Sequence, residues 1–129
     1  MRCTRRLTGE YVVTAREVSS GVVFPDTVVM GPDFRHVFSS EHPHWHVPYR
    51  ALVPRKVKNM LTAGRCISAD IVANDLLAPI QYCFATGQAA GAAAALAVKD
   101  KVNTAQVDVK KLQALLSSQN VPLPDEIIA

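Results

Sequence analysis

The sequence predicts an α/β fold, which these 129 residues taken alone would form as an α+β arrangement. Three observations predict it. β-branched and aromatic residues concentrate in the first half, a short apolar segment is followed by a loop and an Ala/Gly-rich segment, and the last apolar residues repeat at helical spacing. With 49% hydrophobic and 19% charged residues, the chain has material for one core, so we expect a single domain over residues 1–129.

The first half is expected to be mainly β-structure and loop. Thr14 and Glu17 have the spacing of a capping box and predict a short helix, which Gly21 ends. A Pro-punctuated loop is expected over Glu41–Tyr49. Strand character predicts strands over Arg5–Thr14, Val22–Met30 and Arg35–Phe38.

The second half is expected to supply core strands and two helices. Short apolar runs on either side of a polar turn at Pro54–Asn59 predict strands over Arg50–Val53 and Met60–Ala63. A loop over Ile67–Ala78 then leads to a helix from Pro79 to about Val98, since proline suits the first position of a helix. Asp108 is expected to cap a final amphipathic helix, and the tail Val121–Pro124 cannot continue it.

Composition excludes several classes of protein. The net charge is +3, and the Lys and Arg residues are too sparse along the sequence to predict a nucleic-acid interface. Leu76–Val98 carries no formal charge, but it is mostly alanine with proline and glycine inside, which favours a buried helix over a membrane span. The N-terminus lacks the apolar run of a secretory signal, so a cytoplasmic protein is expected.

Cysteine and histidine residues give weak signals. Cys3, Cys66 and Cys83 are odd in number and show no CxxC spacing, so we expect reduced thiols, with Cys66 and Cys83 small and buried. The alternate histidines His42, His44 and His46 would share one side of an extended segment, as a metal site needs. Loop histidines are more often solvated or hydrogen-bonded, and no metal site is predicted.

The order of elements around Gly64 is the strongest signal. An apolar strand would end at Gly64–Arg65, and the helix after the loop carries small residues at Cys83, Gly87, Gly91 and Ala95. Four-residue spacing puts these on one stripe, where the helix backbone can approach another element closely. A packed core helix and a helix that faces a ligand are equally compatible with this stripe.

Three longer motifs carry a resemblance to a known family. Residues 47–54 (VPYRALVP), 59–68 (NMLTAGRCIS) and 83–96 (CFATGQAAGAAAAL) are similar, in order and spacing, to the closing segment of FAD-dependent oxidoreductases related to fumarate reductase flavoproteins. Residues 4–11 and 108–112 extend the resemblance over nearly the whole chain. It implies the C-terminal part of such an enzyme, with 1–47 ending a substrate or cap region and 48–129 completing the FAD-binding domain.

The resemblance also implies roles for residues. Gly64 and Arg65 would pass the ribitol or pyrophosphate of FAD, and Ile80 and Gln81 would lie at the start of the helix that points at the N1/O2 side of the flavin. Ala78 and Gln81 depart from the family, in which an arginine and a proline are common there. Tyr49 and Arg50, with His46, are the candidates for catalysis, and no role is assigned to them.

The sequence lacks one part that this family needs. No G-x-G-x-x-G, the motif that holds the FAD pyrophosphate, occurs in the chain. We therefore expect a chain that is inactive alone and pairs with a missing N-terminal FAD-binding portion or another copy of itself. The alternative is a stand-alone interaction module that forms a homo-oligomer through the small-residue helix.

Overall fold

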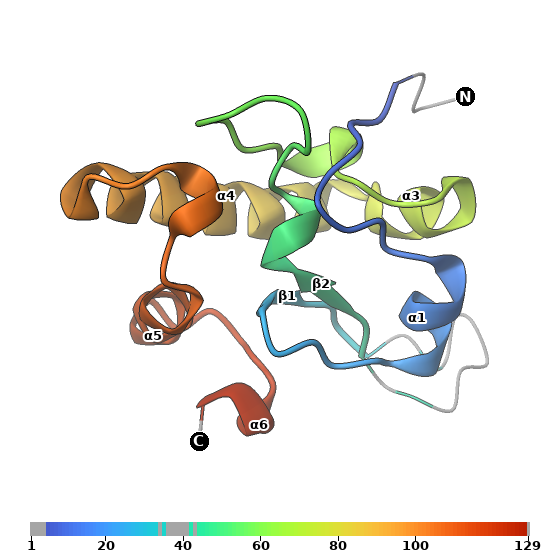
Figure 1. Cartoon of the computed structure of the whole chain (residues 1–129). Helices are drawn as coiled ribbons and strands as arrows, with labels where there is room; N and C mark the ends of the chain where they lie inside the picture. The colour runs from blue at the N-terminus through green and yellow to red at the C-terminus, as the bar shows by residue number, and fades with distance from the viewer. Residues whose placement is uncertain (1–4, 34, 36–41, 43, 129) are drawn as a thin grey trace.

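A computed structural model describes residues 5–33, 35, 42 and 44–128 of the chain. Helices, three short 3₁₀ turns and one small sheet make up the fold (Figure 1). The mixture is compatible with the α+β class expected from the sequence. The elements are α1 (Ala15–Ser20), β1 (Thr27–Met30), β2 (His46–Pro48), η1 (Tyr49–Ala51), η2 (Gly64–Cys66), α3 (Ile71–Leu77), α4 (Ile80–Asp100), η3 (Thr104–Gln106), α5 (Val109–Ser118) and α6 (Asp125–Ile128).

Helix α1 begins and ends as predicted. The Thr14 side chain accepts a hydrogen bond from the Glu17 amide, and the Glu17 carboxylate accepts one from the Thr14 amide. Gly21 ends the helix with a left-handed φ of 65°. Both signals lie within eight residues of chain, so local sequence determines this helix.

The predicted strand over Arg5–Thr14 is wrong. This segment makes two isolated bridges, Gly9 with Pro54 and Val13 with Ala69. The first bridge is antiparallel and the second parallel, because the segment passes from one neighbouring stretch of chain to another. Neither of these stretches runs beside residues 5–14 for enough residues to form a pair of strands.

The sheet consists of β1 and β2, which pair antiparallel. Met30 lies opposite His46, and Thr27 lies opposite Pro48. Strand β1 falls within the predicted Val22–Met30, whereas β2 falls in the segment that was expected to be a loop. Of the predicted strand Arg35–Phe38, only Arg35 is among the described residues.

Neither predicted core strand of the second half forms. Residues 49–51 turn as η1, and residues 60–63 are not part of a sheet. The amide of Thr62 donates to the carbonyl of Leu52 at 2.8 Å, and Ala63 has an extended backbone. The last residue of Met60–Ala63 therefore has the backbone conformation of a strand, but the described residues supply no adjacent strand with which the segment could pair.

The expected loop Ile67–Ala78 contains helix α3, which the sequence reading missed. The Asp70 carboxylate caps α3 by accepting from the Ala73 amide at 2.7 Å, a signal that could have been read. Helix α4 matches the predicted helix closely, with Pro79 as its N-cap rather than its first residue. Asp108 caps α5 as predicted, and the non-helical residues 121–124 separate α5 from α6.

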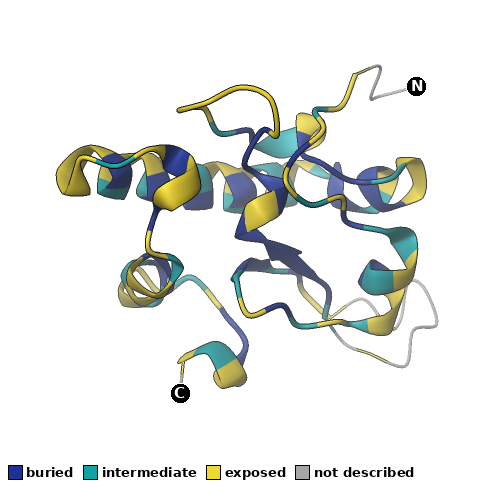
Figure 2. Ribbon diagram, in the orientation of Figure 1, coloured by how far each residue is buried: buried dark blue, intermediate teal, exposed yellow. Residues whose placement is uncertain are grey.

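The core lies between the sheet and the helices α4 and α5, both of which pack on β1. Figure 2 shows the sheet buried between these elements. Trp45 is 2% exposed and meets Tyr82 of α4 edge to face, with ring centroids 4.6 Å apart. The Gln113 side-chain amide donates to the carbonyls of Pro25 and Thr27, which ties α5 to β1.

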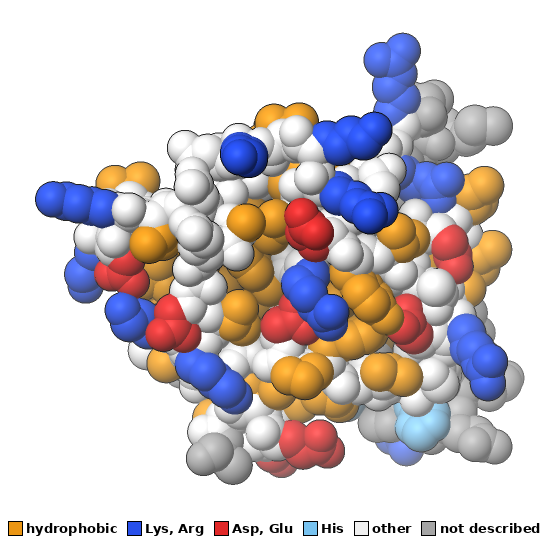
Figure 3. Space-filling model, viewed as in Figure 1, with side chains coloured by type: hydrophobic (Ala, Val, Ile, Leu, Met, Phe, Trp, Pro, Cys, Tyr) orange, Lys and Arg blue, Asp and Glu red, His pale blue; other side chains and the backbone are white. Residues whose placement is uncertain are grey.

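Helix α4 buries only a narrow face. Its buried residues are Thr86, Ala89, Ala93 and Ala97. Among the helices that the structure describes, none is long and apolar enough to cross a bilayer, and the uncharged run Leu76–Val98 is divided between α3 and α4. On the face in Figure 3, Lys and Arg side chains lie at several separate places.

Candidate functional site

Gly64 opens the turn η2 with a backbone conformation that favours glycine. Its φ is 71°, in the left-handed region. A Cβ at this position would lie 3.5 Å from Sγ of Cys83, an ordinary contact distance. The backbone angle, and not lack of space, is therefore the reason for glycine here.

The turn is fixed directly to α4. The amide of Gly64 donates to Oγ1 of Thr86 at 2.8 Å. The Thr86 hydroxyl in turn lies within donor distance of the carbonyls of Tyr82 and Cys83. Thr86 is buried, so this bond is shielded from water and holds η2 on the second turn of α4.

Arg65 is held through its side chain and its carbonyl. Its Nε donates to the carbonyl of Ala78 at 3.4 Å, next to the start of α4. Its own carbonyl accepts from Nδ2 of Asn74 at 3.0 Å, within α3. Two helices thus orient this turn, while Arg65 itself is exposed.

The first turn of α4 faces solvent. Ile80 is 62% exposed, and Gln81 is also exposed. The amides of Tyr82 and Cys83 donate to the carbonyl of Pro79, and the first amides of any α-helix lack an acceptor inside the helix. The 21-residue helix gives this end a partial positive charge. The structure therefore brings Gly64–Arg65 and the Ile80–Gln81 end of α4 together.

Tyr49 lies elsewhere, in the buried turn η1. Its hydroxyl donates to the carbonyl of Thr104 at 2.7 Å. Burial raises the pKa of Tyr49 to about 12, so the phenol stays protonated at neutral pH. This bond attaches η1 to η3.

Arg50 is paired on the surface near the N-terminal segment. Its Nε donates to Asp26 at 2.9 Å, and its guanidinium lies 4.7 Å from the centre of the Tyr11 ring. The hydrogen-bonded Asp26 carboxylate raises the pKa of Arg50 further. A pair of this kind positions β1 beside η1.

His46 is buried in β2. Its Nδ1 lies 3.1 Å from the carbonyl of Val22, to which the Nδ1–H tautomer donates. Burial lowers the pKa of His46 and outweighs that hydrogen bond, so the ring is neutral near pH 7. The hydrogen bonds described for Tyr49, Arg50 and His46 run to Thr104, Asp26 and Val22, and not to η2 or the first turn of α4. That these residues take part in catalysis stays a prediction.

The histidine loop does not gather ligands in the part of the chain that the structure describes. His44 places its Nδ1 2.8 Å from the carbonyl of Gly31, away from the bond that His46 makes. Within the described residues there is no group of three His, Cys, Asp or Glu side chains that could hold a metal ion.

The prediction that Cys66 and Cys83 are buried is wrong for Cys66. Cys66 is exposed rather than buried, and Cys83 is half-buried. The reason is that η2 turns the Cys66 side chain outward, where its thiol lies 3.2 Å from the carbonyl of Ala63. Cys3 lies outside the described residues.

The small-residue stripe of α4 is an exposed surface. Gly87, Gly91 and Ala95 all face outward, and a Cβ at either glycine would meet nothing within 4 Å. Phe84 on the same side of the helix is 74% exposed. The face that packs in the core is instead the one that carries Ala89 and Ala93.

Two residues that hold the turn were not singled out from the sequence. Thr86 lies within the motif at residues 83–96 but was given no role there, and Asn74 lies in a segment that was expected to be a loop. Their partners, Gly64 and Arg65, are 22 and 9 residues away. Only the folded chain identifies them.

Comparison with known proteins gives one match. The model of the family described as FAD dependent oxidoreductase matches residues 1–116, most of the chain. Neither the curated proteins nor the solved structures provide a significant match.

Proposed function

Because the chain belongs to the family of FAD-dependent oxidoreductases, we propose that η2 and the start of α4 form one wall of the flavin site. FAD is the cofactor of the complete enzyme, and it supplies the acceptor or donor for a hydride. Within the family, the motifs of this chain resemble fumarate reductase flavoproteins. The chain would contribute as the C-terminal portion of such an enzyme.

The hydrogen bond from Gly64 to Thr86 carries this proposal. It joins the turn Gly64–Arg65 to the second turn of α4, and so holds the turn close to the start of that helix. Gly64 and Arg65 would contact the ribitol or the pyrophosphate. The exposed amides at Ile80 and Gln81 would bind the N1/O2 edge of the ring.

The chemistry of this wall suits an electron-rich ligand. The positive end of α4 favours negative charge, and Arg65 adds a full positive charge beside it. Glycine at position 64 also leaves the backbone open to close approach. These residues therefore fit a flavin, and they bind and orient it without carrying out a proton transfer of their own.

The rest of the FAD site would come from another portion of the enzyme. No G-x-G-x-x-G occurs among the 129 residues, and residues 60–63 have no adjacent strand in the described chain. An N-terminal FAD-binding portion would supply both. We therefore expect weak flavin binding and no hydride transfer by the chain alone.

Nuclear magnetic resonance tests this directly. FAD is added to the ¹⁵N-labelled chain up to about millimolar concentration, a range that detects weak binding. The amides of Gly64, Arg65, Ile80 and Gln81 should shift together. Perturbation of other amides while these four stay fixed contradicts the flavin wall, and saturation at 1:1 at micromolar FAD contradicts the need for another portion.

A second function is favoured by the exposed face of α4. Ile80, Phe84 and Val98 are 62%, 74% and 80% exposed, which is a large apolar exposure along one helix. An antiparallel second copy would set Gly87 opposite Gly91 and let the two backbones approach closely. The chain would then be a homo-oligomeric interaction module.

Light scattering separates the two uses of α4. Gly91→Leu should dissociate an oligomer that is built on this face, whereas Ala114→Leu on exposed α5 serves as the matched control. An unchanged mass in Gly91→Leu removes the interaction module. The flavin proposal does not depend on this result.

A further inference from the structure

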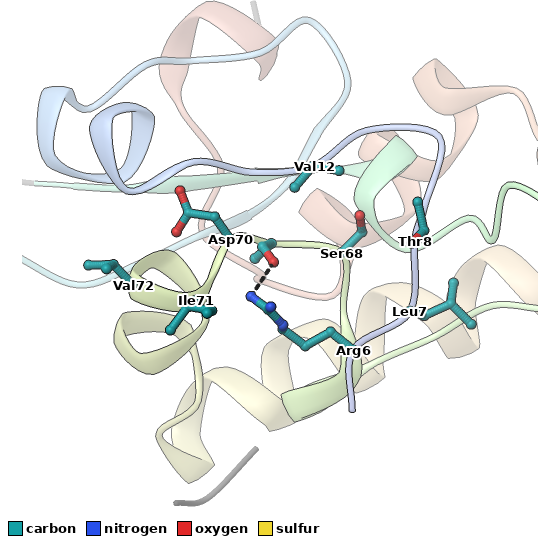
Figure 4. Close-up of a pocket in the computed structure, with 9 residues that line it drawn as sticks. Arg6, Leu7, Thr8, Val12, Ser68, Asp70, Ile71 and Val72 are labelled. Atoms are coloured by element: carbon teal, nitrogen blue, oxygen red, sulfur yellow. Dashed lines mark hydrogen bonds between the residues drawn. The ribbon is translucent and has the colours of Figure 1, made fainter. Parts of the chain in front are cut away.

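We propose that the cavity between residues 6–12 and 68–72 binds a small amphiphilic monoanion, a carboxylate or phosphate monoester group on a short apolar chain. Nine residues line it, drawn in Figure 4, and its volume is about 680 Å³. Small-molecule sites commonly occupy about 300–1,000 Å³. The cavity therefore has room for such a molecule.

Among the described residues that line the cavity, Arg6 supplies the only positive charge. Its Nη1 donates to the carbonyl of Ala69 at 3.0 Å, which holds the guanidinium over the cavity. Figure 4 shows this side chain reaching from the N-terminal segment toward the start of α3. A guanidinium has five N–H donors in a planar fork, so others remain for a carboxylate or phosphate.

Asp70, the only acidic residue in the part of the lining that the structure describes, already accepts hydrogen bonds from the backbone. One carboxylate oxygen accepts from the Ala73 amide at 2.7 Å and the other from the Ala15 amide at 2.8 Å. Burial raises the pKa of Asp70, but the backbone hydrogen bonds and the positive charge of Arg6 outweigh it and leave the pKa below its usual value. Both Asp70 oxygens are thus occupied by amides, and Arg6 is the group in the described lining that can bind an anion.

Ser68 gives a second, independent observation. It lines the cavity, is 1% exposed, and its hydroxyl has no hydrogen-bond partner in the described chain. A buried hydroxyl without a partner costs free energy. In the proposed complex the hydroxyl donates to an oxygen of the anion that Arg6 binds.

Apart from Thr8, the remaining lining residues are apolar, and they would contact the rest of the ligand. Val12, Ile71 and Val72 are 44%, 69% and 59% exposed at this cavity, although β-branched side chains of this size are usually buried. A short branched alkyl chain would cover them. One cation beside an apolar wall thus fits a molecule with one charged end.

The cavity adjoins the proposed flavin wall. Its residues 68–72 begin two positions after the end of η2, and the amide of Leu7, which lines the cavity, donates to the carbonyl of Cys66 in η2. Assigning the anion as the substrate rests on the proposed function. Binding of the anion to the chain does not, because it requires no flavin.

The test uses four probes and the ¹⁵N-labelled chain without FAD. The probes are 3-methylbutanoate, isobutyl phosphate, inorganic phosphate and the neutral 3-methylbutanamide. Either amphiphilic anion should shift the amides of Arg6, Thr8, Ser68 and Ile71 with an affinity on the order of millimolar. The tighter of the two identifies the charged group as carboxylate or phosphate.

Variants assign the interaction to residues. Arg6→Gln should weaken binding about tenfold or more, as expected for loss of a charge-assisted bond, while Arg16→Gln on exposed α1 should change it less than about twofold. Ser68→Ala should weaken binding several-fold without loss of stability, because the free hydroxyl has no partner to lose. The dispersion of the spectra shows that each variant is folded.

Three results would overturn the proposal. They are equal shifts with 3-methylbutanamide, equal affinities of the Arg6→Gln and Arg16→Gln chains, and inorganic phosphate binding as tightly as either amphiphilic anion. Failure of the anions to bind at about tens of millimolar would also overturn it. A normal FAD response in the same chain would then leave the flavin wall standing.

Discussion

The Gly64 amide lies 2.8 Å from the Thr86 hydroxyl oxygen, and this bond attaches the turn η2 to α4 across 22 residues of sequence. Thr86→Val keeps the shape of the side chain but removes the acceptor. We expect it to cost about 1–3 kcal/mol, because the Gly64 amide loses a buried partner. Urea denaturation measures this.

Thr86→Ser is the matched control for that prediction. It retains the hydroxyl and loses one methyl group, so it should cost about 1 kcal/mol. If the valine variant is as stable as the serine variant, the bond does not hold the turn.

Gly64→Ala tests the left-handed backbone at the proposed flavin wall. With φ at 71° and a Cβ contact no closer than 3.5 Å, the penalty is conformational, about 1–2 kcal/mol. Gly64→Asn should cost less, since asparagine tolerates this region better. Gly87→Ala, where a Cβ meets nothing, should instead stabilise α4 by about 0.5–1 kcal/mol. Thermal unfolding measures the stability of the three variants, and the reverse order of stability would contradict this account.

Asp70→Ala removes the cap of α3 and a bond to α1 together. Two backbone amides, of Ala73 and Ala15, lose their acceptor, so a loss of about 2 kcal/mol is expected. Asp75→Ala, on the exposed side of α3, should change stability by less than about 0.5 kcal/mol. Equal unfolding midpoints in urea for both variants would show that Asp70 does not join the two helices.

His46 predicts a dependence of stability on pH. Burial lowers its pKa in the folded chain below the usual 6.5, so the unfolded chain takes up a proton first as the pH falls. The stability from His46 is therefore complete above about pH 6.5 and declines below it, by at most about 1.4 kcal/mol per pH unit.

The variant His46→Asn checks the assignment. Asparagine can still donate toward the carbonyl of Val22 but does not titrate. Its free energy of unfolding should lack the decline between about pH 6.5 and 5 that the wild type shows. Above pH 7.5 the difference between the two proteins should be constant. An identical slope in both would assign the pH dependence to other groups.

Local signals in the sequence predicted α1, α4 and α5, whereas α3 was missed although Asp70 caps it locally. The absence of non-local pairing in the described part of the chain explains why several predicted strands are wrong. Thr14 with Glu17, and Asp108, cap their helices through atoms at most three residues away. The strand at Met60–Ala63 depends on a neighbour, and the single bond from Thr62 to Leu52 does not build one. β-propensity describes fit to a pleated surface, which needs a partner to exist.

The same distinction applies to the candidate site. Gly64, Arg65, Ile80 and Gln81 were singled out through family motifs, and the structure brings these segments together. No binding site was predicted at Arg6, because the residue that lines the same cavity, Ser68, lies more than sixty residues away in the sequence. The cavity forms only in the folded chain, where the N-terminal segment crosses the start of α3.

Trp45 is the only tryptophan in the sequence, and its ring lies against Tyr82 in the first turn of α4. The chain thus contains a built-in optical probe at the contact between the sheet and this helix. Separation of α4 from the sheet would expose the indole and shift its emission to longer wavelength, even if both elements kept their secondary structure. Excitation at the tryptophan band would therefore follow the docking of α4 without any label.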